Sequence, residues 1–398
     1  MLLRATAEQD AFRAEVREFI DAHLDPGTRR RVLDGYTLSR DDYVKWHRAL
    51  HQRGWGVPPW PVEHGGPGWD AMQRHIFDEE TTLAGAPELV PFGYKMVAPV
   101  LMKYGTAAQQ SYFLPRIASL EHWWSQGYSE PGAGSDLASL RMRAQREGDH
   151  YLVNGQKVWN THGQYADWIF CLVRTSTEGK PQQGISFLLI DLRSPGVEVR
   201  PIVTLDGAHE INEVWFHDVK VPVDQRVGEE NHGWTYAKYL LSHERANFGT
   251  FMAQCRRDMA RIRRIAAGER EAAGTVAQSP LFSARLERLE AELVAIETTN
   301  LREIAAGDLT DASSPTASFL KIMSSELQQE VAELAMLAAG PGALVFDRAV
   351  LAGSGIEGDA RASWCAPLAA TYLNMRKTAI YGGSNEIQKN IAAKLLLG

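Results

Sequence analysis

The sequence predicts an α+β fold in which an N-terminal helical domain and a C-terminal four-helix bundle flank a central antiparallel β domain. Three observations predict it. Apolar residues recur at helical spacing near both ends of the chain, short strand-like runs crowd its middle, and turns rather than crossover helices join those runs. A chain of 398 residues is also too long for one ordinary core. We therefore expect three domains, at residues 1–121, 122–232 and 233–398.

The first region is expected to be helical. Phe12, Val16 and Ile20 recur at helical spacing with charged residues between them. Pro26 and Gly27 are expected to stop that helix, because proline cannot continue it and glycine favours its end.

The middle region is expected to contain short strands. Asn154-Gly155 separates two strand-like stretches, residues 151–153 and 157–159, and this dipeptide favours the tight turn of a β-hairpin. Further strand-like runs cover residues 169–173, 185–192, 197–203 and 214–221. The turns between them carry glycine and proline, which indicates an antiparallel arrangement.

Helical spacing returns from about Gly233. Leu286, Leu289 and Leu293 mark one helix, and residues 319–334 mark another. Loops are expected at residues 307–315 and 353–358. Long helices with short breaks are typical of a bundle.

The composition excludes several classes of partner. A net charge of −7 gives no general attraction to nucleic acid or to an anionic membrane. No apolar stretch is long enough to span a bilayer, and the first residues turn polar before a signal-peptide core forms. Cys171, Cys255 and Cys365 lie far apart and are interpreted as reduced, buried thiols. We expect a cytoplasmic protein.

Residues 127–136, Gly-Tyr-Ser-Glu-Pro-Gly-Ala-Gly-Ser-Asp, form a glycine-rich loop near the start of the middle region. Glycines allow backbone N–H groups to approach a ligand, and serine hydroxyls can donate to its oxygens. Composition alone makes this an ordinary junction loop.

The order of residues is more specific, because three separated blocks resemble the acyl-CoA dehydrogenase family in sequence and order. They are residues 127–136, 157–161 and 381–388. The resemblance implies oxidation of an acyl-CoA, or a carrier-bound acyl thioester, to its α,β-unsaturated form. It further implies FAD as cofactor, with the β-hydride passed to flavin N5, and an electron-transfer flavoprotein as acceptor. Tyr128 departs from the pattern, since the family more often has an aliphatic residue there.

The resemblance also assigns roles to residues. Those expected to bind the cofactor are Tyr128, Ser129, Gly134, Ser135, Trp159, Thr161, Gly383, Ser384, Asn385 and Glu386. Ser129 is expected to bond the pyrimidine end of the flavin, Trp159 to pack on the isoalloxazine, and Thr161 to reach N5. Ser135 is also expected near the substrate. Trp159 taken alone is as consistent with a strand residue that fills a core.

The expected catalytic base is Glu244. Many family members carry the base directly after a tyrosine in the last block, but here that position is Gly382. A second branch, which includes isovaleryl and long-chain enzymes, places it on an earlier helix before an arginine, as in Glu244-Arg245. Arg245 is expected to contact substrate. The backbone N–H of Gly382 is expected to donate to the thioester oxygen, where negative charge develops.

Helical spacing supports Glu244 independently of the resemblance. It shares one stripe with the apolar residues Ala237, Leu240, Leu241, Phe248, Phe251, Met252 and Cys255. Burial on such a face raises the pKa of a carboxylate, which suits a base that takes a carbon proton. The alternative is a structural glutamate paired with an arginine.

Two family motifs are missing. Residues 272–278 lack the usual Arg-x-x-Phe-Gly element, and residues 336–342 replace the usual Gln-x-x-Gly-Gly motif. Both normally bind the flavin diphosphate across a subunit interface. The chain is therefore expected in a homo-oligomer or in a heteromer with a related dehydrogenase subunit. Several stretches resemble the large subunits of bacterial heteromeric acyl-CoA dehydrogenases, those acting on pimeloyl-CoA among them.

Two other functions stay open at this point. One is a flavin monooxygenase or oxidase on the same fold, against which Glu244 argues. The other is a non-catalytic partner subunit, which the missing motifs favour and the intact Ser129, Trp159 and Thr161 oppose.

Overall fold

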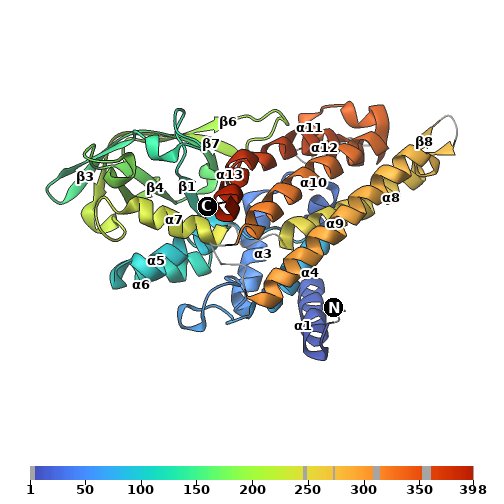
Figure 1. The fold of residues 1–398 in the computed structure, drawn as a ribbon, viewed down its shortest axis with the longest axis horizontal. Helices are drawn as coiled ribbons and strands as arrows, with labels where there is room; N and C mark the ends of the chain where they lie inside the picture. Colours follow the sequence, from blue (N-terminus) through green and yellow to red (C-terminus); the bar gives the residue numbers. More distant parts are fainter. Residues whose placement is uncertain (1–4, 245–248, 272–273, 308–313, 352–359, 398) are drawn as a thin grey trace.

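The computed structural model describes residues 5–244, 249–271, 274–307, 314–351 and 360–397, and the side chains of residues 242–244 lie outside what it describes. Helices occupy both ends of the chain and a sheet occupies its middle, so the predicted fold class is confirmed. Figure 1 shows the sheet at one end of the molecule and the long C-terminal helices at the other. The loop expected at 353–358 falls outside the described residues.

The N-terminal region consists of α1 (Ala7–His23), α2 (Pro26–Asp34), α3 (Arg40–Arg53), α4 (Ala71–Leu83), the π-helical turn η2 (Phe92–Val97), α5 (Ala98–Tyr104) and α6 (Ala107–Ala118). Reciprocal capping boxes start four of these helices, at Thr6, Ser39, Asp70 and Thr106. The helix predicted to stop at Pro26 ends at His23, and Pro26 itself begins α2, because proline suits the first turn of a helix.

The middle region forms one sheet from β1 (Trp124–Gly127), β2 (Arg143–Glu147), β3 (His150–Thr161), β4 (Trp168–Arg174), β5 (Ile185–Asp191), β6 (Val197–Ile202) and β7 (Ile211–Pro222). Its order is β1-β4-β2-β3-β7-β6, with β5 on β4. Most pairs are antiparallel as predicted, but β1 runs parallel to β4. Alternate residues of β4 enter different cores, which explains its unbroken apolar sequence.

The hairpin predicted at Asn154-Gly155 is wrong. These residues lie inside β3, and the turn from β2 to β3 falls at Gly148 instead. The register of β3 on β7 shifts between Val153 and Gly155. Gly155 adopts φ 143°, and an added Cβ would lie 2.9 Å from the Cα of Met142. Two residues of β7, His217 and Asp218, oppose the single residue Asn154 here, so β7 carries the bulge, and the Asn154 side chain bonds Asp218 across it.

The C-terminal region consists of α7 (Gly233–Glu244), α8 (Gly249–Gly268), the short strands β8 (Arg270–Glu271) and β9 (Gly274–Thr275), α9 (Pro280–Ala306), α10 (Thr316–Ala339), α11 (Arg348–Leu351), α12 (Ala360–Met375), η9 (Arg376–Ala379) and α13 (Asn385–Leu397). A shared apolar core joins α8, α9, α10 and α12. In Figure 1, α8 carries β8 to the end of the molecule farthest from the sheet.

The apolar residues predicted to share one stripe around Glu244 pack into two different cores. Ala237 and Leu240 of α7 pack into the core shared with the sheet and the N-terminal helices. Met252 and Cys255 of α8 pack into the separate core of the bundle. The two helices thus face different neighbours, although one spacing pattern runs through both.

Two expectations from the sequence, about membrane-spanning segments and about the cysteines, can be checked in the part of the chain that the structure describes. None of its helices combines the length and apolarity needed to cross a membrane. Its three cysteines are free and buried, as predicted.

Candidate active site

The glycine-rich loop follows β1. The ring of Tyr128 is buried and lies edge-on to Phe170 at 5.7 Å and to Phe187 at 6.4 Å between centroids. The ring of Tyr128, where the family more often has an aliphatic side chain, therefore fills a core. Ser129 is half-buried and accepts a 2.9 Å hydrogen bond from the amide of Val158 through its carbonyl.

The other predicted loop residues, Gly134 and Ser135, are exposed. A side chain built at Gly134 would meet no atom within 4 Å, so the space beside the loop is open. Such a loop can present backbone N–H groups and the Ser135 hydroxyl to a ligand.

A buried ion pair that the sequence reasoning missed fixes this loop to β3. The Nζ of Lys157, whose side chain is 0% exposed, donates to Glu130 Oε1 at 2.8 Å and to the carbonyl of Tyr128 at 3.0 Å. The Glu130 carboxylate also accepts from the amides of Arg141 and Met142, at 2.6 and 2.9 Å. Burial lowers the pKa of Lys157, and the Glu130 charge opposes that shift. Tyr151, Val153 and Lys157 are buried on one face of β3, so strand alternation could have marked Lys157 as inward-facing, but the hairpin predicted at Asn154-Gly155 divided that strand.

The end of β3 presents Trp159 outwards. Its φ is 63°, its side chain is 60% exposed, and it lies within a second register shift of β3, between Lys157 and Asn160. The neighbours Val158 and Asn160 are buried. A bulge commonly redirects one side chain, and here it exposes a large aromatic face next to the glycine-rich loop. This indole is therefore not a core filler.

Thr161 ends β3 beside β1. Its carbonyl accepts a 3.0 Å hydrogen bond from the hydroxyl of Ser125, and the Asn160 amide donates to the carbonyl of Gln126 at 2.6 Å. The strand that carries Trp159 and Thr161 is thus joined to the strand that leads into Ser129.

The C-terminal block packs against α10. Asn385 is buried, and its Oδ1 accepts from Lys321 Nζ at 3.1 Å and from Ser325 Oγ at 3.2 Å. Gly382 and Gly383 have positive φ of 65° and 85°. The carbonyl of Gly382 accepts a 3.0 Å hydrogen bond from Gln388.

Ser384 and Glu386 complete this block. The Ser384 hydroxyl accepts from the amide of Ile387 at 3.4 Å, and Glu386 is exposed at the start of α13. Backbone and Ser384 hydrogen bonds lower the pKa of Glu386. The Asn385 side chain is occupied by α10, so a ligand would meet this block through its backbone.

Glu210 joins the C-terminal region to the end of β3. Its carboxylate pairs with Lys377 and accepts from Asn374 at 3.2 Å, and its carbonyl accepts from the amide of His162 at 2.8 Å. Burial opposes ionisation of Glu210, but Lys377 outweighs it and holds the pKa of the carboxyl below its usual value. Because Lys377 stands five residues before Gly382, this contact brings the Gly382 segment towards Trp159 and Thr161. Sequence reasoning missed both members of this pair.

The predicted base lies at the limit of the described chain. Helix α7 ends at Glu244, whose side chain lies outside the described residues, as does Arg245 entirely. Their expected roles therefore stay predictions, as do those of the cofactor residues. The described residues do fit a planar aromatic cofactor, because the exposed Trp159 offers a stacking face beside an open loop.

Comparisons with known proteins agree with this organisation. Three family models match in order: the acyl-CoA dehydrogenase N-terminal domain over residues 6–121, the middle domain over 125–219 and the C-terminal domain over 231–397. The chain is 37% identical to acyl-CoA dehydrogenase IpdE1 of Mycobacterium tuberculosis, across 98% of this chain and 97% of that protein.

Solved structures give the same result. The chain is similar to a chain of the ChsE4-ChsE5 complex from Mycobacterium tuberculosis, with 32% identity, a TM-score of 0.82, and coverage of 100% of this chain and 99% of that one. It is likewise similar to a chain of the Tcur3481-Tcur3483 steroid acyl-CoA dehydrogenase, with 29% identity, a TM-score of 0.85 and the same coverage. The chain therefore belongs to the acyl-CoA dehydrogenase family, and it is a flavin-dependent oxidoreductase that acts on acyl-CoA.

Proposed function

We propose that this chain converts an acyl-CoA thioester to its α,β-unsaturated form, with Glu244 as the base that removes the α-proton. FAD, held by Ser129, Trp159, Thr161 and the Gly383–Glu386 segment, would supply the acceptor for the β-hydride. A separate electron-transfer flavoprotein would then take the electrons.

The protein's own groups have two tasks in this reaction. Removing the α-proton places negative charge on the thioester oxygen, so donors must meet that oxygen. The backbone N–H of Gly382 is proposed as one donor, and the absence of a side chain there leaves that N–H intact. Arg245 and Ser135 are proposed to contact the substrate.

The observation that carries the proposal is the contact of Glu210 with Lys377 and Asn374. It brings the strand with Trp159 and Thr161 towards the segment with Gly382, and a site assembled from both needs this proximity. The exposed indole at the strained φ of Trp159 adds support, because such strain is commonly maintained at functional sites.

Anaerobic titration of the flavin-loaded protein with acyl-CoA tests the proposal. Octanoyl-CoA is expected to bleach the flavin absorbance of the wild type. The Glu244→Gln variant is expected to keep its flavin and to lose at least about a hundredfold in reduction rate, the lower range for a general base. Glu229→Gln is the matched control, since Glu229 is an exposed glutamate just before α7. Normal reduction in Glu244→Gln would assign the base to another group.

We further propose that the chain works in a heteromer with a related dehydrogenase subunit. The described part of the segment that lacks the Arg-x-x-Phe-Gly element, residues 274–278, begins with β9, which pairs with β8 at the end of the molecule remote from the sheet (Figure 1). A motif missing from that end can be supplied by another chain. The two similar structures, the ChsE4-ChsE5 complex and the Tcur3481-Tcur3483 steroid acyl-CoA dehydrogenase, are each named for two components.

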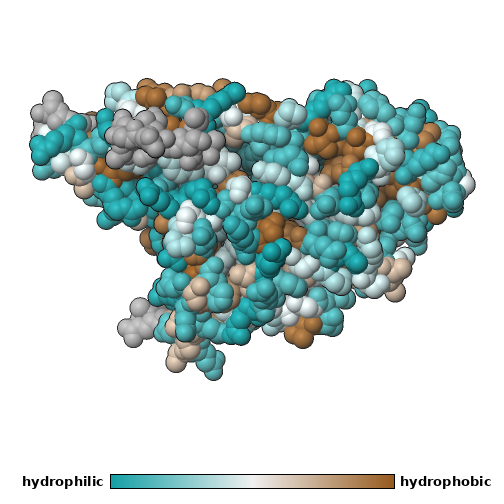
Figure 2. Space-filling model, turned by 180° about the vertical axis from the view of Figure 1, so that it is seen from behind, coloured by the Kyte–Doolittle hydropathy of each residue, from teal (hydrophilic) through white to brown (hydrophobic). Residues whose placement is uncertain are grey.

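An exposed apolar cluster supports the same proposal. It consists of Val203, Leu205, Leu344, Val345 and Phe346, which are 55–77% exposed. A Cβ at Gly207 would lie 2.4 Å from the Phe346 ring, so the loop before α11 contacts the loop between β6 and β7. Figure 2 shows that apolar residues on one face gather in patches within a largely hydrophilic surface. Exposed apolar patches commonly mark protein interfaces.

Purification of the chain alone tests the heteromer. A required partner predicts low flavin occupancy and an undefined oligomeric state by light scattering, with both restored by co-expression of the related subunit. A stable homo-oligomer with full flavin occupancy would contradict it.

A further inference from the structure

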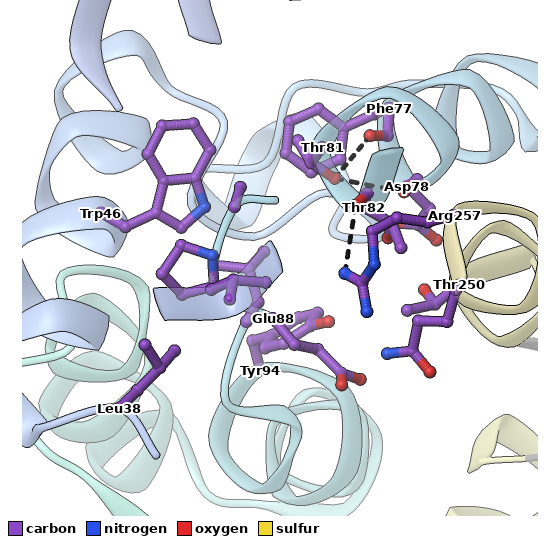
Figure 3. A pocket seen from close by; sticks show the side chains of 15 residues that line it. Leu38, Trp46, Phe77, Asp78, Thr81, Thr82, Glu88, Tyr94, Thr250 and Arg257 are labelled. Carbon is purple, nitrogen blue, oxygen red and sulfur yellow. Dashed lines mark hydrogen bonds between the residues drawn. The ribbon is translucent and has the colours of Figure 1, made fainter. Parts of the chain in front are cut away.

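A polar cavity lies between the N-terminal helices and α8. It has a volume of about 140 Å³ and is bounded by α3, α4, α8 and the loop before η2. A cavity of that size holds roughly a benzene-sized group. Its polar lining residues are Asp78, Thr81, Thr82, Glu88, Tyr94, Thr250, Gln254 and Arg257 (Figure 3). An ion pair of 2.9 Å between Glu79 and Arg256 holds α4 and α8 together beside it.

Glu88 is the polar group that the protein leaves unmatched. Its side chain lines the cavity and keeps solvent-accessible surface there. Burial raises the pKa of its carboxyl. Among the described residues no hydrogen bond or ion pair is made to Glu88. A carboxyl group in that position is an acceptor, or when protonated a donor, that a ligand can use.

Arg257 supplies donors on the opposite wall. Its Nε contacts Asp258 at 3.2 Å, and its Nη1 makes a long 3.4 Å contact with the carbonyl of Thr82. A guanidinium has five N–H donors, so most of them stay available to the cavity. Figure 3 shows Arg257 reaching from α8 into the space between Thr82 and Glu88, with Thr250 on the same wall.

The charged residues around the cavity favour some ligand groups over others. A carboxylate would meet the cations Arg257 and Lys95, but both already act on the carboxyls Asp78 and Glu88, and like charges at close range disfavour a third carboxylate. A plain alkyl group would cover Glu88 and Arg257 without bonding to them, which costs about 1–3 kcal/mol for each buried polar group left unpaired. A hydroxyl both donates and accepts, so one group can satisfy Glu88 and Arg257 together.

Tyr43 connects this cavity to the candidate active site. Its pKa is raised by burial first, and the charges of Glu88 and Glu210 add to the shift, so the phenol lies near both carboxylates. Its ring also lies 5.4 Å from that of His162, the residue after Thr161. Tyr43 thus brings the cavity close to the end of β3 that carries Thr161.

We infer that this cavity receives the far end of the acyl group and that this end carries a neutral hydroxyl group, bound between Glu88 and Arg257. The inference rests on the proposed function, and it makes the substrate a hydroxylated acyl-CoA rather than a plain or dicarboxylic one.

Matched pairs of CoA esters test it on the flavin-loaded protein with any subunit that copurifies. The pairs are hexanoyl- and 6-hydroxyhexanoyl-CoA, octanoyl- and 8-hydroxyoctanoyl-CoA, and decanoyl- and 10-hydroxydecanoyl-CoA, with suberyl-CoA as the dicarboxylic probe. Anaerobic flavin bleaching gives an apparent Kd for each. For at least one length, the hydroxylated ester is expected to bind about tenfold more tightly than its plain partner, and suberyl-CoA more weakly than both.

Two variants separate the inference from the proposed function. Glu88→Leu is expected to remove the preference for the hydroxylated ester while plain esters bind as well or better, and Glu88→Gln to keep part of the preference. Glu63→Leu is the matched exposed control. Equal binding of both partners at every length, unchanged by Glu88→Leu, would overturn the inference and leave the proposed function standing. Failure of all esters to bleach the flavin would overturn the proposed function, and the inference with it.

Discussion

Two charged clusters in this protein differ in how their hydrogen bonds are filled. In the first, Glu130 and Lys157 pair at 2.8 Å, and neighbouring backbone amides and a carbonyl satisfy the remaining atoms. In the second, Asp78, Glu88 and Arg257 surround a cavity, and Glu88 has no partner among the described residues. Both clusters combine carboxylates with a cation, but only the first is complete without a ligand.

The difference separates a structural role from a binding role. Burial of a charge costs several kcal/mol unless a partner and hydrogen bonds offset that cost. The complete pair offsets it within the fold and thereby fixes the glycine-rich loop to β3. The cavity leaves part of the cost in place, which is useful only where a substrate supplies the missing bonds. Stability and function should therefore respond in opposite directions to substitution in the two clusters.

The largest expected effect is at Lys157. Lys157→Met leaves Glu130 buried without its charged partner, so we expect the free energy of unfolding to fall by about 3–5 kcal/mol. Weaker flavin retention should accompany this loss because the loop is released. Unfolding in urea, followed by circular dichroism, measures the change.

Two further variants control this prediction. Lys220→Met changes an exposed lysine of the same sheet and is expected to shift stability by less than about 0.5 kcal/mol. The double variant Lys157→Met/Glu130→Gln should recover part of the loss, because the unpaired charge is then absent. A single variant as stable as the wild type would show that the pair is dispensable.

The sequence alone predicted some regions of the molecule better than others. Periodicity identified the helices, most strands and the fold class, since each depends on local spacing. It misplaced the hairpin at Asn154-Gly155, because this pair continues β3 opposite a bulge in β7, and pairing with that distant strand leaves no local signal. It also joined α7 and α8 into one stripe, although their apolar faces enter different cores.

The site was predictable only where ordered blocks marked it. The glycine-rich loop, Trp159 and the C-terminal block were found in this way. The pairs Glu130–Lys157 and Glu210–Lys377 were not, because their members stand 27 and 167 residues apart and no local pattern links them. The cavity around Glu88 was missed for the same reason, since its walls come from helices distant in sequence.

An intermediate effect of the opposite sign is expected at Asp78. Burial raises the pKa of this carboxyl from 3.8 to about 7. Below pH about 4 it is protonated in both states, and between pH about 4 and 7 only the unfolded state releases the proton, so wild-type stability falls as pH rises. Asp78→Asn lacks this loss and should be more stable by about 1–2 kcal/mol at pH 8, with little difference at pH 4.

Urea unfolding across this pH range measures the effect, and Asp224→Asn is the control because Asp224 is exposed. A variant that gains no stability at pH 8 would mean that the cavity carboxyls are as well satisfied as Glu130. The comparison between the two clusters would then fail.

The smallest expected effect is at Asn385, and it tests whether the C-terminal block resembles the complete Glu130–Lys157 pair or the open cavity. Asn385 accepts from Lys321 and Ser325 and donates to Glu326 at 3.3 Å, so its side chain resembles the complete pair rather than the open cavity. Asn385→Ala should therefore cost about 1 kcal/mol of stability, equally in flavin-loaded and flavin-free protein. The exposed Asn390→Ala is its control on the same helix. A tenfold loss of FAD affinity with unchanged unfolding would instead place the Asn385 side chain at the cofactor, as the family resemblance implies, and would show that a filled hydrogen-bond network does not by itself exclude a binding role.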